Sequence, residues 1–280
     1  MSEAEATSVA QALEGARARG VDRLDAQLLL AAELGRPRSW LLAHGDETLA
    51  PSQAQAFAAR CAERAAGVPL AYLLGEKEFR GLTLKVDRNV LVPRPDTETL
   101  VDWALELLRA APPRPAVLDL GTGSGAIALA IAQAHPQALV CATDVSPQAL
   151  AIARANGERL GLAVEWMQGD WWSPLAGRRF DFVLTNPPYV AGDDPHLAAL
   201  AHEPKLALTP GGDGLDALRA IVRGAARHLR PGGWLLLEHG HDQSEAVRAL
   251  LHAAGLRHAA TRKDLAGRPR CSAAQSPATL

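Results

Sequence analysis

Four consecutive residues, Asn186-Pro187-Pro188-Tyr189, place an amide, two prolines and an aromatic ring in one short turn. Proline has a fixed φ and no N–H, so the Asn186 side chain and the nearby carbonyls form a rigid set of acceptors. Such a set fits a planar group that bears an NH2, whose nitrogen is a poor nucleophile and must be oriented before it reacts. The turn therefore predicts chemistry at an NH2 nitrogen. The alternative is a strand-terminating turn with a structural Tyr189.

The residues before this turn predict where it lies. Phe180 to Thr185 is a strand-like run that leads directly into Asn186. In open α/β sheets, ligands bind outside the carboxyl ends of the strands. We therefore expect the Asn-Pro-Pro-Tyr turn at the edge of a sheet where a site belongs.

A second motif lies upstream, between an expected buried strand at 116–120 and an expected helix at 126–132. The connection is Gly121-Thr122-Gly123-Ser124-Gly125. Glycines let the backbone pass close to a ligand, and the helix N-terminus offers free N–H groups. The G-x-G-x-G spacing differs from the dinucleotide fingerprint and lacks the lysine of a P-loop. By itself such a loop is also compatible with a simple tight turn.

Asp144 strengthens the case for a nucleoside site. It ends the next expected strand, 138–143, and follows the first glycine by 144 − 121 = 23 residues. An acidic residue about 20 positions after such a loop is where a ribose diol is bound. The glycine loop, the acid and the Asn-Pro-Pro-Tyr turn in this order make a much more specific signal than any one of them.

Taken together, six ordered motifs resemble the bacterial peptide chain release factor glutamine methyltransferases, over about residues 5–270. The motifs are Gly75-Glu76-Lys77-Glu78-Phe79, Val92-Pro93-Arg94-Pro95-Asp96-Thr97-Glu98, Asp119-Leu120-Gly121-Thr122-Gly123-Ser124-Gly125, Asn186-Pro187-Pro188-Tyr189, Glu203-Pro204 and Glu238-His239-Gly240. The resemblance implies S-adenosyl-L-methionine as cofactor and N5-methylation of the glutamine in the Gly-Gly-Gln loop of class I release factors. One departure is Gly157, where the family pattern leads us to expect Ala.

The resemblance also implies roles for residues at the cofactor. Besides the glycine loop, Asp144 is expected to accept hydrogen bonds from both ribose hydroxyls. Asp170 is expected to receive the adenine amino group, and Trp171 to stack on the ring, with Trp172 as the alternative. Asp119 either orders the glycine turn or faces the sulfonium. Arg94 and Glu98 have two alternative roles: they lie near the substrate entrance, or they serve in a helix cap or an interlobe salt bridge.

At the reacting centre we expect Asn186 and the Pro187 carbonyl to accept the two hydrogens of the substrate amide. Pro188 rigidifies the turn, and Tyr189 is expected to pack on the amide plane. Because an adenine N6 presents the same NH2 geometry, a nucleic-acid N6-adenine methyltransferase is the alternative enzyme. A non-catalytic cofactor-binding or adaptor protein is a third possibility, which the intact turn argues against.

Composition limits the partners. The 280 residues are 48% hydrophobic, enough for a real core, and carry a formal net charge of −2. Non-specific nucleic-acid binding needs Lys and Arg at the phosphates, so we expect no direct nucleic-acid contact. Three scattered cysteines without zinc spacing predict no metal site. The acidic segment Met1–Glu5, without a following apolar run, predicts no secretory signal, no membrane association and a cytoplasmic protein.

The expected fold is α/β, a Rossmann-like class I methyltransferase sheet with a small N-terminal helical domain joined by a β-hairpin. Residues 1–74 form the helical substrate-docking domain, 75–95 a hairpin linker and 96–280 the S-adenosylmethionine-dependent methyltransferase domain. The hairpin is predicted to pair 82–86 with 89–92. Further elements are expected as helices at 96–109, 147–160, 213–229 and 242–254 and strands at 164–168 and 234–238, with edge strands toward residue 270.

Overall fold

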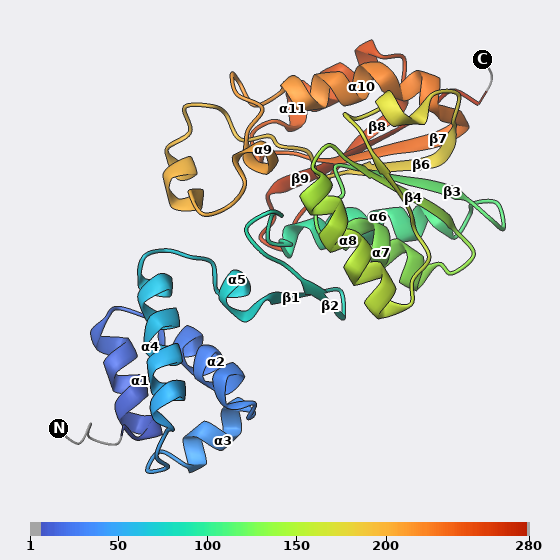
Figure 1. Cartoon of the computed structure of the whole chain (residues 1–280). Coiled ribbons are helices and arrows are strands. Elements are labelled where there is room, and N and C mark those ends of the chain that lie inside the picture. The colour runs from blue at the N-terminus through green and yellow to red at the C-terminus, as the bar shows by residue number, and fades with distance from the viewer. Residues whose placement is uncertain (1–6, 279–280) are drawn as a thin grey trace. The chain divides into compact units, whose positions relative to one another are not determined.

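The computed structural model describes residues 7–278 and divides into two compact units between Glu76 and Lys77 (Figure 1). The segment Met1–Glu5, on which the prediction about a secretory signal rests, lies outside the described residues. Within residues 7–278 no helix is long and apolar enough to cross a membrane. Each unit is described by itself.

The N-terminal unit is helical, as its periodicity predicts. Its helices begin and end at clear signals: Ser8 forms a capping box with Gln11, and Gly35 ends a helix in the left-handed conformation. Leu29, Leu30 and Leu41 are buried in its core. The helices are α1 (Val9–Ala18), α2 (Arg23–Leu34), α3 (Arg38–Ala43), α4 (Pro51–Ala65) and α5 (Leu70–Leu74).

The C-terminal unit is built on a seven-stranded sheet in the order β5-β4-β3-β6-β7-β9-β8. Neighbours are parallel from β5 to β7, and the pairs β7-β9 and β8-β9 are antiparallel. The strands are β3 (Ala116–Leu120), β4 (Leu139–Asp144), β5 (Glu165–Gln168), β6 (Phe180–Thr185), β7 (Leu229–Glu238), β8 (Arg257–Lys263) and β9 (Pro269–Gln275). The helices are α6 (Asp96–Leu108), α7 (Ala126–Ala134), α8 (Pro147–Leu160), α9 (Lys205–Leu208), α10 (Asp216–His228) and α11 (Ser244–Ala253).

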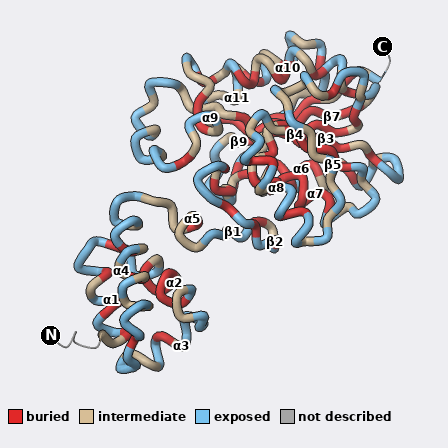
Figure 2. The backbone as a smooth tube through the Cα atoms, in the orientation of Figure 1, coloured by how far each residue is buried: buried red, intermediate tan, exposed pale blue. Residues whose placement is uncertain are grey.

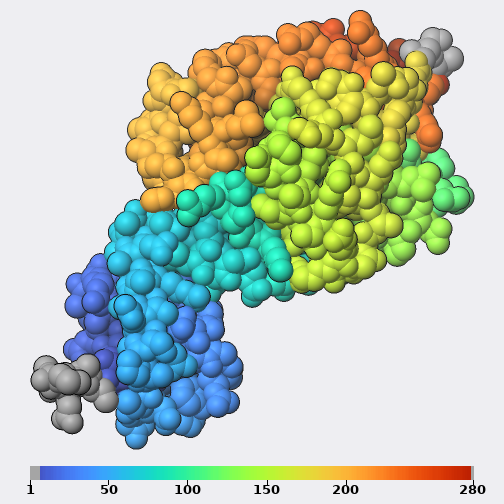
Figure 3. Space-filling model, viewed as in Figure 1, coloured from blue at the N-terminus to red at the C-terminus, as the bar shows by residue number. Residues whose placement is uncertain are grey.

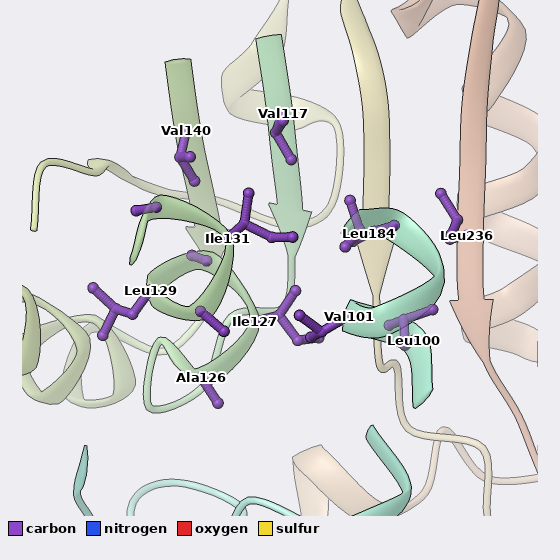
Figure 4. Close-up of a cluster of buried hydrophobic side chains, with 14 of the residues drawn as sticks. Leu100, Val101, Val117, Ala126, Ile127, Leu129, Ile131, Val140, Leu184 and Leu236 are labelled. Carbon is purple, nitrogen blue, oxygen red and sulfur yellow. The ribbon is translucent and has the colours of Figure 1, made fainter. Parts of the chain in front are cut away.

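Helices cover both faces of this sheet, so its central strands are the most buried part of the unit (Figures 1 and 2). On one face, α6 and α7 pack on β3, β4, β6 and β7. Figure 4 shows Leu100 and Ile127 of these helices beside Val117 and Leu184 of the strands. On the other face, α10 and α11 form a second core, with Ile221 and other apolar side chains fully buried. This two-sided burial is why the strands are continuous apolar runs in the sequence.

The predicted hairpin is wrong in its pairing. The two paired strands are β1 (Glu76–Phe79) and β2 (Leu82–Lys85), whereas 89–92 forms no strand. Arg80, at φ 48°, and Gly81, at φ 77°, make the tight turn. After β2, Asp87 turns the chain by accepting from the Asn89 backbone N–H at 2.8 Å and from its side chain at 2.9 Å. Residues 77–95 belong to the C-terminal unit, because Phe79 and Leu84 are buried in its core.

Other helices and strands begin or end a few residues away from the predicted boundaries. Strand β7 begins at Leu229 and carries Pro231-Gly232-Gly233 within it, with a register shift against β6. The last two strands extend the sheet to Gln275, past the expected residue 270. Helix α10 begins at Asp216 instead of Asp213, because the Asp213 carboxylate turns the chain by accepting from the Leu215 N–H at 3.1 Å.

Candidate active site

The parallel register brings the two sequence motifs to one edge of the sheet. Leu120 at the end of β3 lies beside Thr143 of β4 and Thr185 of β6. The next residues of the three strands are Gly121, Asp144 and Asn186, so all three enter the same region. A cavity of about 410 Å³ opens there and is lined by these residues together with residues of the segments 89–94, 169–171, 204–210 and 216–217. Its size is that of an ordinary small-molecule site.

The glycine loop has the conformation that its sequence requires. Gly121, Gly123 and Gly125 have φ values of 70°, 56° and 86°, which disfavour side chains with a Cβ. A Cβ on Gly125 would also lie 3.0 Å from Leu129. The four residues from Gly121 to Ser124 line the cavity, whereas Gly125 is the N-cap of α7. The loop therefore brings backbone close to whatever occupies the cavity.

Asp119 orders this turn and is not one of the lining residues. Its Oδ2 accepts from Thr122 Oγ1 at 2.6 Å and from the Ala128 N–H at 3.2 Å. The side chain is only 1% exposed, and Oδ1 has no partner within residues 7–278. Burial raises the pKa of Asp119 to about 7, although these two hydrogen bonds lower it. Of the two roles left open for Asp119, the structure shows the ordering of the turn.

Asp144 faces the cavity from the end of β4. Its Oδ2 accepts from the Gly123 N–H and its Oδ1 from the Ser146 N–H, both at 2.9 Å. Burial raises the pKa of this carboxyl, and the hydrogen bonds to Ser146 and Gly123 oppose that shift. Each oxygen keeps a lone pair for a further donor. The fixed carboxylate thus suits two neighbouring hydroxyls.

The adjacent tryptophans lie in different environments. Trp171, at φ 42°, lines the cavity with Asp170, and its ring is 3.4 Å from where a Cβ of Gly121 would be. The Trp172 ring instead stacks on His228 at 4.7 Å between ring centroids. Its Nε1 donates to the Ile221 carbonyl at 3.2 Å. Trp172 is therefore a core residue, and Trp171 is the one available to a flat ligand.

The Asn-Pro-Pro-Tyr turn divides between the cavity and the core. Asn186, Pro187 and Pro188 line the cavity, and Asn186 Nδ2 donates to Thr97 Oγ1 at 3.1 Å. Tyr189 packs in the core on the α10 face of the sheet and donates through its hydroxyl to Glu238 Oε1 at 3.0 Å. Burial, followed by the nearby Glu238 charge, raises the pKa of Tyr189. The structure thus brings Asn186 and both prolines to the cavity but not the Tyr189 ring.

Comparison with known proteins assigns the chain to a family. Residues 98–215 match the family model described as methyltransferase small domain, and residues 7–75 the one described as PrmC N-terminal domain. A release factor glutamine methyltransferase of Xylella fastidiosa strain Temecula1 is 51% identical over 269 residues, covering 95% of this chain and 98% of that protein. The chain belongs to the release factor glutamine methyltransferase family.

Two further matches differ in what they show. The release factor glutamine methyltransferase of Bordetella pertussis strain Tohama I is 51% identical over 258 residues, covering 90% of this chain and 94% of that protein. A methyltransferase structure from Pyrococcus furiosus is 19% identical, has a TM-score of 0.54 and covers 77% of this chain and 98% of that chain. The second match shows the common fold alone.

Around the cavity, this member of the family has polar contacts that sequence reasoning missed. Thr97, in the first turn of α6, lines the cavity and accepts a hydrogen bond from Asn186. Glu238 accepts a hydrogen bond from the Tyr189 hydroxyl. Asn156 of α8 donates to the Ser124 carbonyl and to the Lys85 carbonyl, both at 3.0 Å, which ties the glycine loop to the hairpin. A fully buried Asn in a helix is the available sequence signal, but a single sequence does not show its burial.

A second connection of the methyltransferase unit ties the 87–95 segment to the loop before α9. Arg94 lines the cavity and forms an ion pair with the buried carboxylate of Glu203, which also accepts from the Val92 N–H at 3.1 Å. Figure 3 shows the surfaces of these two segments, in teal and in yellow-orange, side by side. Arg94 therefore lies both at the cavity wall and in a salt bridge. Glu98 lies apart and accepts from the Arg80 N–H at 3.3 Å.

Proposed function

We propose that this protein transfers a methyl group from S-adenosyl-L-methionine to the side-chain amide nitrogen, N5, of the glutamine in the Gly-Gly-Gln loop of class I release factors. The observation that carries this proposal is the Asn186 side chain. Its Nδ2 is occupied by Thr97, so the acceptor that remains for a ligand is Oδ1, at a cavity that also holds a glycine loop and Asp144. Membership of the release factor glutamine methyltransferase family supports the same substrate.

The cavity residues fit the proposed cofactor. Asp144 offers spare lone pairs to a ribose diol, and the left-handed Gly121 and Gly123 leave room for close backbone approach. Trp171 supplies a flat apolar face, and Asp170 beside it is an acceptor for an exocyclic amine. When bound, S-adenosylmethionine supplies a methyl group that its sulfonium already activates. The chain therefore has to supply position more than chemical activation.

Asn186 orients the nucleophile. In this proposal its Oδ1 and the Pro187 carbonyl accept the two hydrogens of the glutamine amide and aim the nitrogen lone pair along the line of displacement. Orientation of this kind is worth up to about 7–11 kcal/mol for well-placed reactants. As the N–C bond forms and the S–C bond breaks, the nitrogen gains positive charge, and its extra proton leaves to water. No strong base is required, and Pro188 keeps the turn rigid.

Tyr189 has a supporting part in this scheme. Its hydroxyl is held by Glu238 and its backbone carbonyl accepts from Gln243 Nε2 at 2.9 Å. Both contacts anchor the far end of the turn to β7 and to the segment before α11. We propose that Tyr189 stabilises the conformation of the turn in place of packing on the substrate amide.

The substrate and its location follow from the same proposal. Release factors are the protein partners, and residues 1–74 supply their docking surface, while residues 77–95 fold with the methyltransferase domain. The protein acts in the cytoplasm, where translation termination takes place. The net charge of −2 favours a protein substrate over the backbone of a nucleic acid.

A labelled-methyl experiment tests this function. The protein is incubated with methyl-labelled S-adenosylmethionine and either a release factor, the same factor with its Gly-Gly-Gln glutamine changed to Asn, or double-stranded DNA. We expect label in the first sample alone, located by mass spectrometry on the glutamine amide. Label on DNA would instead support the N6-adenine alternative, and label on neither would support a non-catalytic protein.

A further inference from the structure

A buried hydroxyl joins the two strands that lead into the glycine loop and into the Asn-Pro-Pro-Tyr turn. Thr185, the last residue of β6, is 0% exposed, and its Oγ1 donates to the carbonyl of Leu120, the last residue of β3, at 2.8 Å. A carbonyl oxygen can only accept, so the direction of this hydrogen bond is fixed. The next residues of the two strands are Asn186 and Gly121, which both line the cavity. The hydrogen bond therefore lies immediately before the two main parts of the proposed site.

The other contacts of these two parts run to different elements. Asp144 of β4 and Asn156 of α8 form hydrogen bonds with the glycine loop. Asn186 donates instead to Thr97 of α6. None of these contacts joins the loop to Asn186. The hydrogen bond of Thr185 differs from them because it connects the strand that leads into the loop with the strand that leads to Asn186.

A hydroxyl at this position is an exception within its strand. The three residues before Thr185 are buried and apolar, and valine would fill nearly the same volume as threonine. Apolar packing has no preferred direction, whereas a hydrogen bond holds its two atoms at a set distance. Branching at Cβ also restricts the rotation of the side chain. Thr185 therefore fixes the separation of the two strand ends more closely than an apolar side chain would.

The separation of these strand ends matters for the proposed reaction. In that reaction the glycine loop contacts the cofactor and Asn186 contacts the glutamine amide, so the gap between methyl donor and acceptor depends on how far apart the two segments lie. A misplacement of about 1 Å can lower a rate by about 10²-fold. Each ligand binds mainly to its own segment, so its affinity depends much less on this separation.

We infer that Thr185 is a positioning residue that sets the distance between the glycine loop and Asn186 through its hydrogen bond to the Leu120 carbonyl. This inference rests on the proposed methylation of a glutamine amide. Loss of the hydrogen bond should slow methyl transfer and leave the affinity for S-adenosylmethionine close to that of the wild type. A residue that only stabilised the sheet would lower the free energy of unfolding without slowing transfer in the folded protein.

Thr143 provides a matched control on the other side of Leu120. In β4 it is the register partner of Leu120, as Thr185 is in β6. Its side chain is 1% exposed, and its hydroxyl has no hydrogen-bond partner within residues 7–278. Thr143→Val and Thr185→Val are therefore the same substitution at equally buried positions of the sheet. Only Thr185→Val breaks a side-chain hydrogen bond between β3 and its neighbour.

Single-turnover transfer of labelled methyl to a release factor tests the inference in the full-length protein at saturating cofactor. We expect Thr185→Val to lower the rate about tenfold, because the strand ends are no longer held at a set distance. Thr185→Ser, which keeps the hydroxyl, should recover most of the rate, and Thr143→Val should stay close to the wild type. Calorimetry should give similar S-adenosylmethionine affinities for all of these proteins. Should Thr185→Val not fold, Thr185→Cys, whose thiol is a weak donor, takes its place with the same expected outcomes.

A second comparison measures whether Thr185 acts on the placement of Asn186. In an Asn186→Ala background, which lacks the acceptor, Thr185→Val should lower the rate by a much smaller factor than it does beside Asn186. The inference is overturned if this factor is the same in both backgrounds, if Thr185→Ser or Thr143→Val is as slow as Thr185→Val, or if weaker cofactor binding accounts for the loss. If the wild-type protein methylates no release factor, the proposed function fails; if it does so and Thr185→Val is equally fast, only the inference fails.

Discussion

Asn186 and Thr97 are 89 positions apart in the chain, yet Asn186 Nδ2 donates to Thr97 Oγ1 at 3.1 Å. The helix that precedes the first strand of the large sheet thereby contributes to a site whose glycine loop, Asp144 and Asn186 all follow that strand. The contact also explains why the first turn of α6 lines the cavity. The contact makes the geometry of the Asn-Pro-Pro-Tyr turn dependent on α6.

Asp144→Ala should weaken S-adenosylmethionine binding by roughly 1.5–3 kcal/mol, because charge-assisted hydrogen bonds to the ribose are lost. The variant also releases the Gly123 and Ser146 N–H groups that the carboxylate now holds. Titration calorimetry measures the change, with Asp193→Ala, at an exposed position outside the cavity lining, as the matched control. Unchanged affinity in Asp144→Ala would remove this residue from the cofactor site.

Substitution by Leu should affect mainly cofactor binding at Trp171 and mainly the free energy of unfolding at Trp172. Trp171→Leu should weaken cofactor binding by about 1–3 kcal/mol through lost stacking, with little effect on unfolding. Trp172→Leu should lower the free energy of unfolding by about 2–3 kcal/mol, because its ring stacks on His228 and its Nε1 bonds to Ile221. Calorimetry and urea denaturation of both variants provide the test. Weaker cofactor binding in Trp172→Leu alone would reverse the assignment.

Stability should fall as pH rises from about 4 to 7. Burial raises the pKa of Asp119 and of Glu238 to about 7 in the folded protein, above the values near 4 in an unfolded chain. In this window the folded state holds protons that the unfolded state releases, so each unit of pKa shift costs about 1.4 kcal/mol at higher pH. Urea denaturation without cofactor at pH 5 and pH 8 measures the slope.

Asp119→Asn is the matched variant for this pH dependence. Its amide oxygen can still accept from Thr122 and Ala128, and it carries no charge to desolvate. Relative to wild type, the variant should therefore gain stability on going from pH 5 to pH 8. A constant difference between the two proteins at both pH values would show that Asp119 does not titrate in this range.

The fragment that tests the N-terminal domain should begin at residue 77. Phe79, Leu82 and Leu84 are buried in the core of the C-terminal unit, so a fragment beginning near residue 90 loses about 4.5–9 kcal/mol of apolar burial. We expect residues 77–280 to fold and bind cofactor but to methylate a release factor poorly. Full activity of this fragment would show that the helical domain is not the recognition element.

Local signals predicted most of the fold. The strands 116–120 and 180–185 and the helix 147–160 were predicted at the bounds that the structure has, because apolar runs and a proline at the helix start are local features. The hairpin was mispredicted because its turn contains Arg80 at positive φ, where sequence favours glycine or asparagine. Strands β1 and β2 are also only four residues long each, too short for an alternation of apolar and polar residues to identify their pairing.

The sequence predicts those site residues that directly follow a parallel strand. Gly121, Asp144 and Asn186 follow directly from parallel strands, and the structure brings them to one cavity. Thr97 and Asn156 lie on helices, and their contacts with the turn and the glycine loop arise from tertiary packing that no spacing in the sequence reveals. Glu238 ends the predicted strand 234–238, but its contact with Tyr189 is equally a product of packing. Tyr189 shows the same limit, because its ring direction depends on the buried Glu238.

Single-turnover transfer of labelled methyl to a Gly-Gly-Gln release factor measures whether Asn186 orients a glutamine amide for methyl transfer. Asn186→Ala should lower the rate by at least about 10²-fold, with little effect on folding. Asn186→Asp, which still accepts both hydrogens, should lose less, and the release factor with Gln changed to Asn should take up no label. Transfer by Asn186→Ala at the wild-type rate would show that Asn186 does not orient the substrate amide.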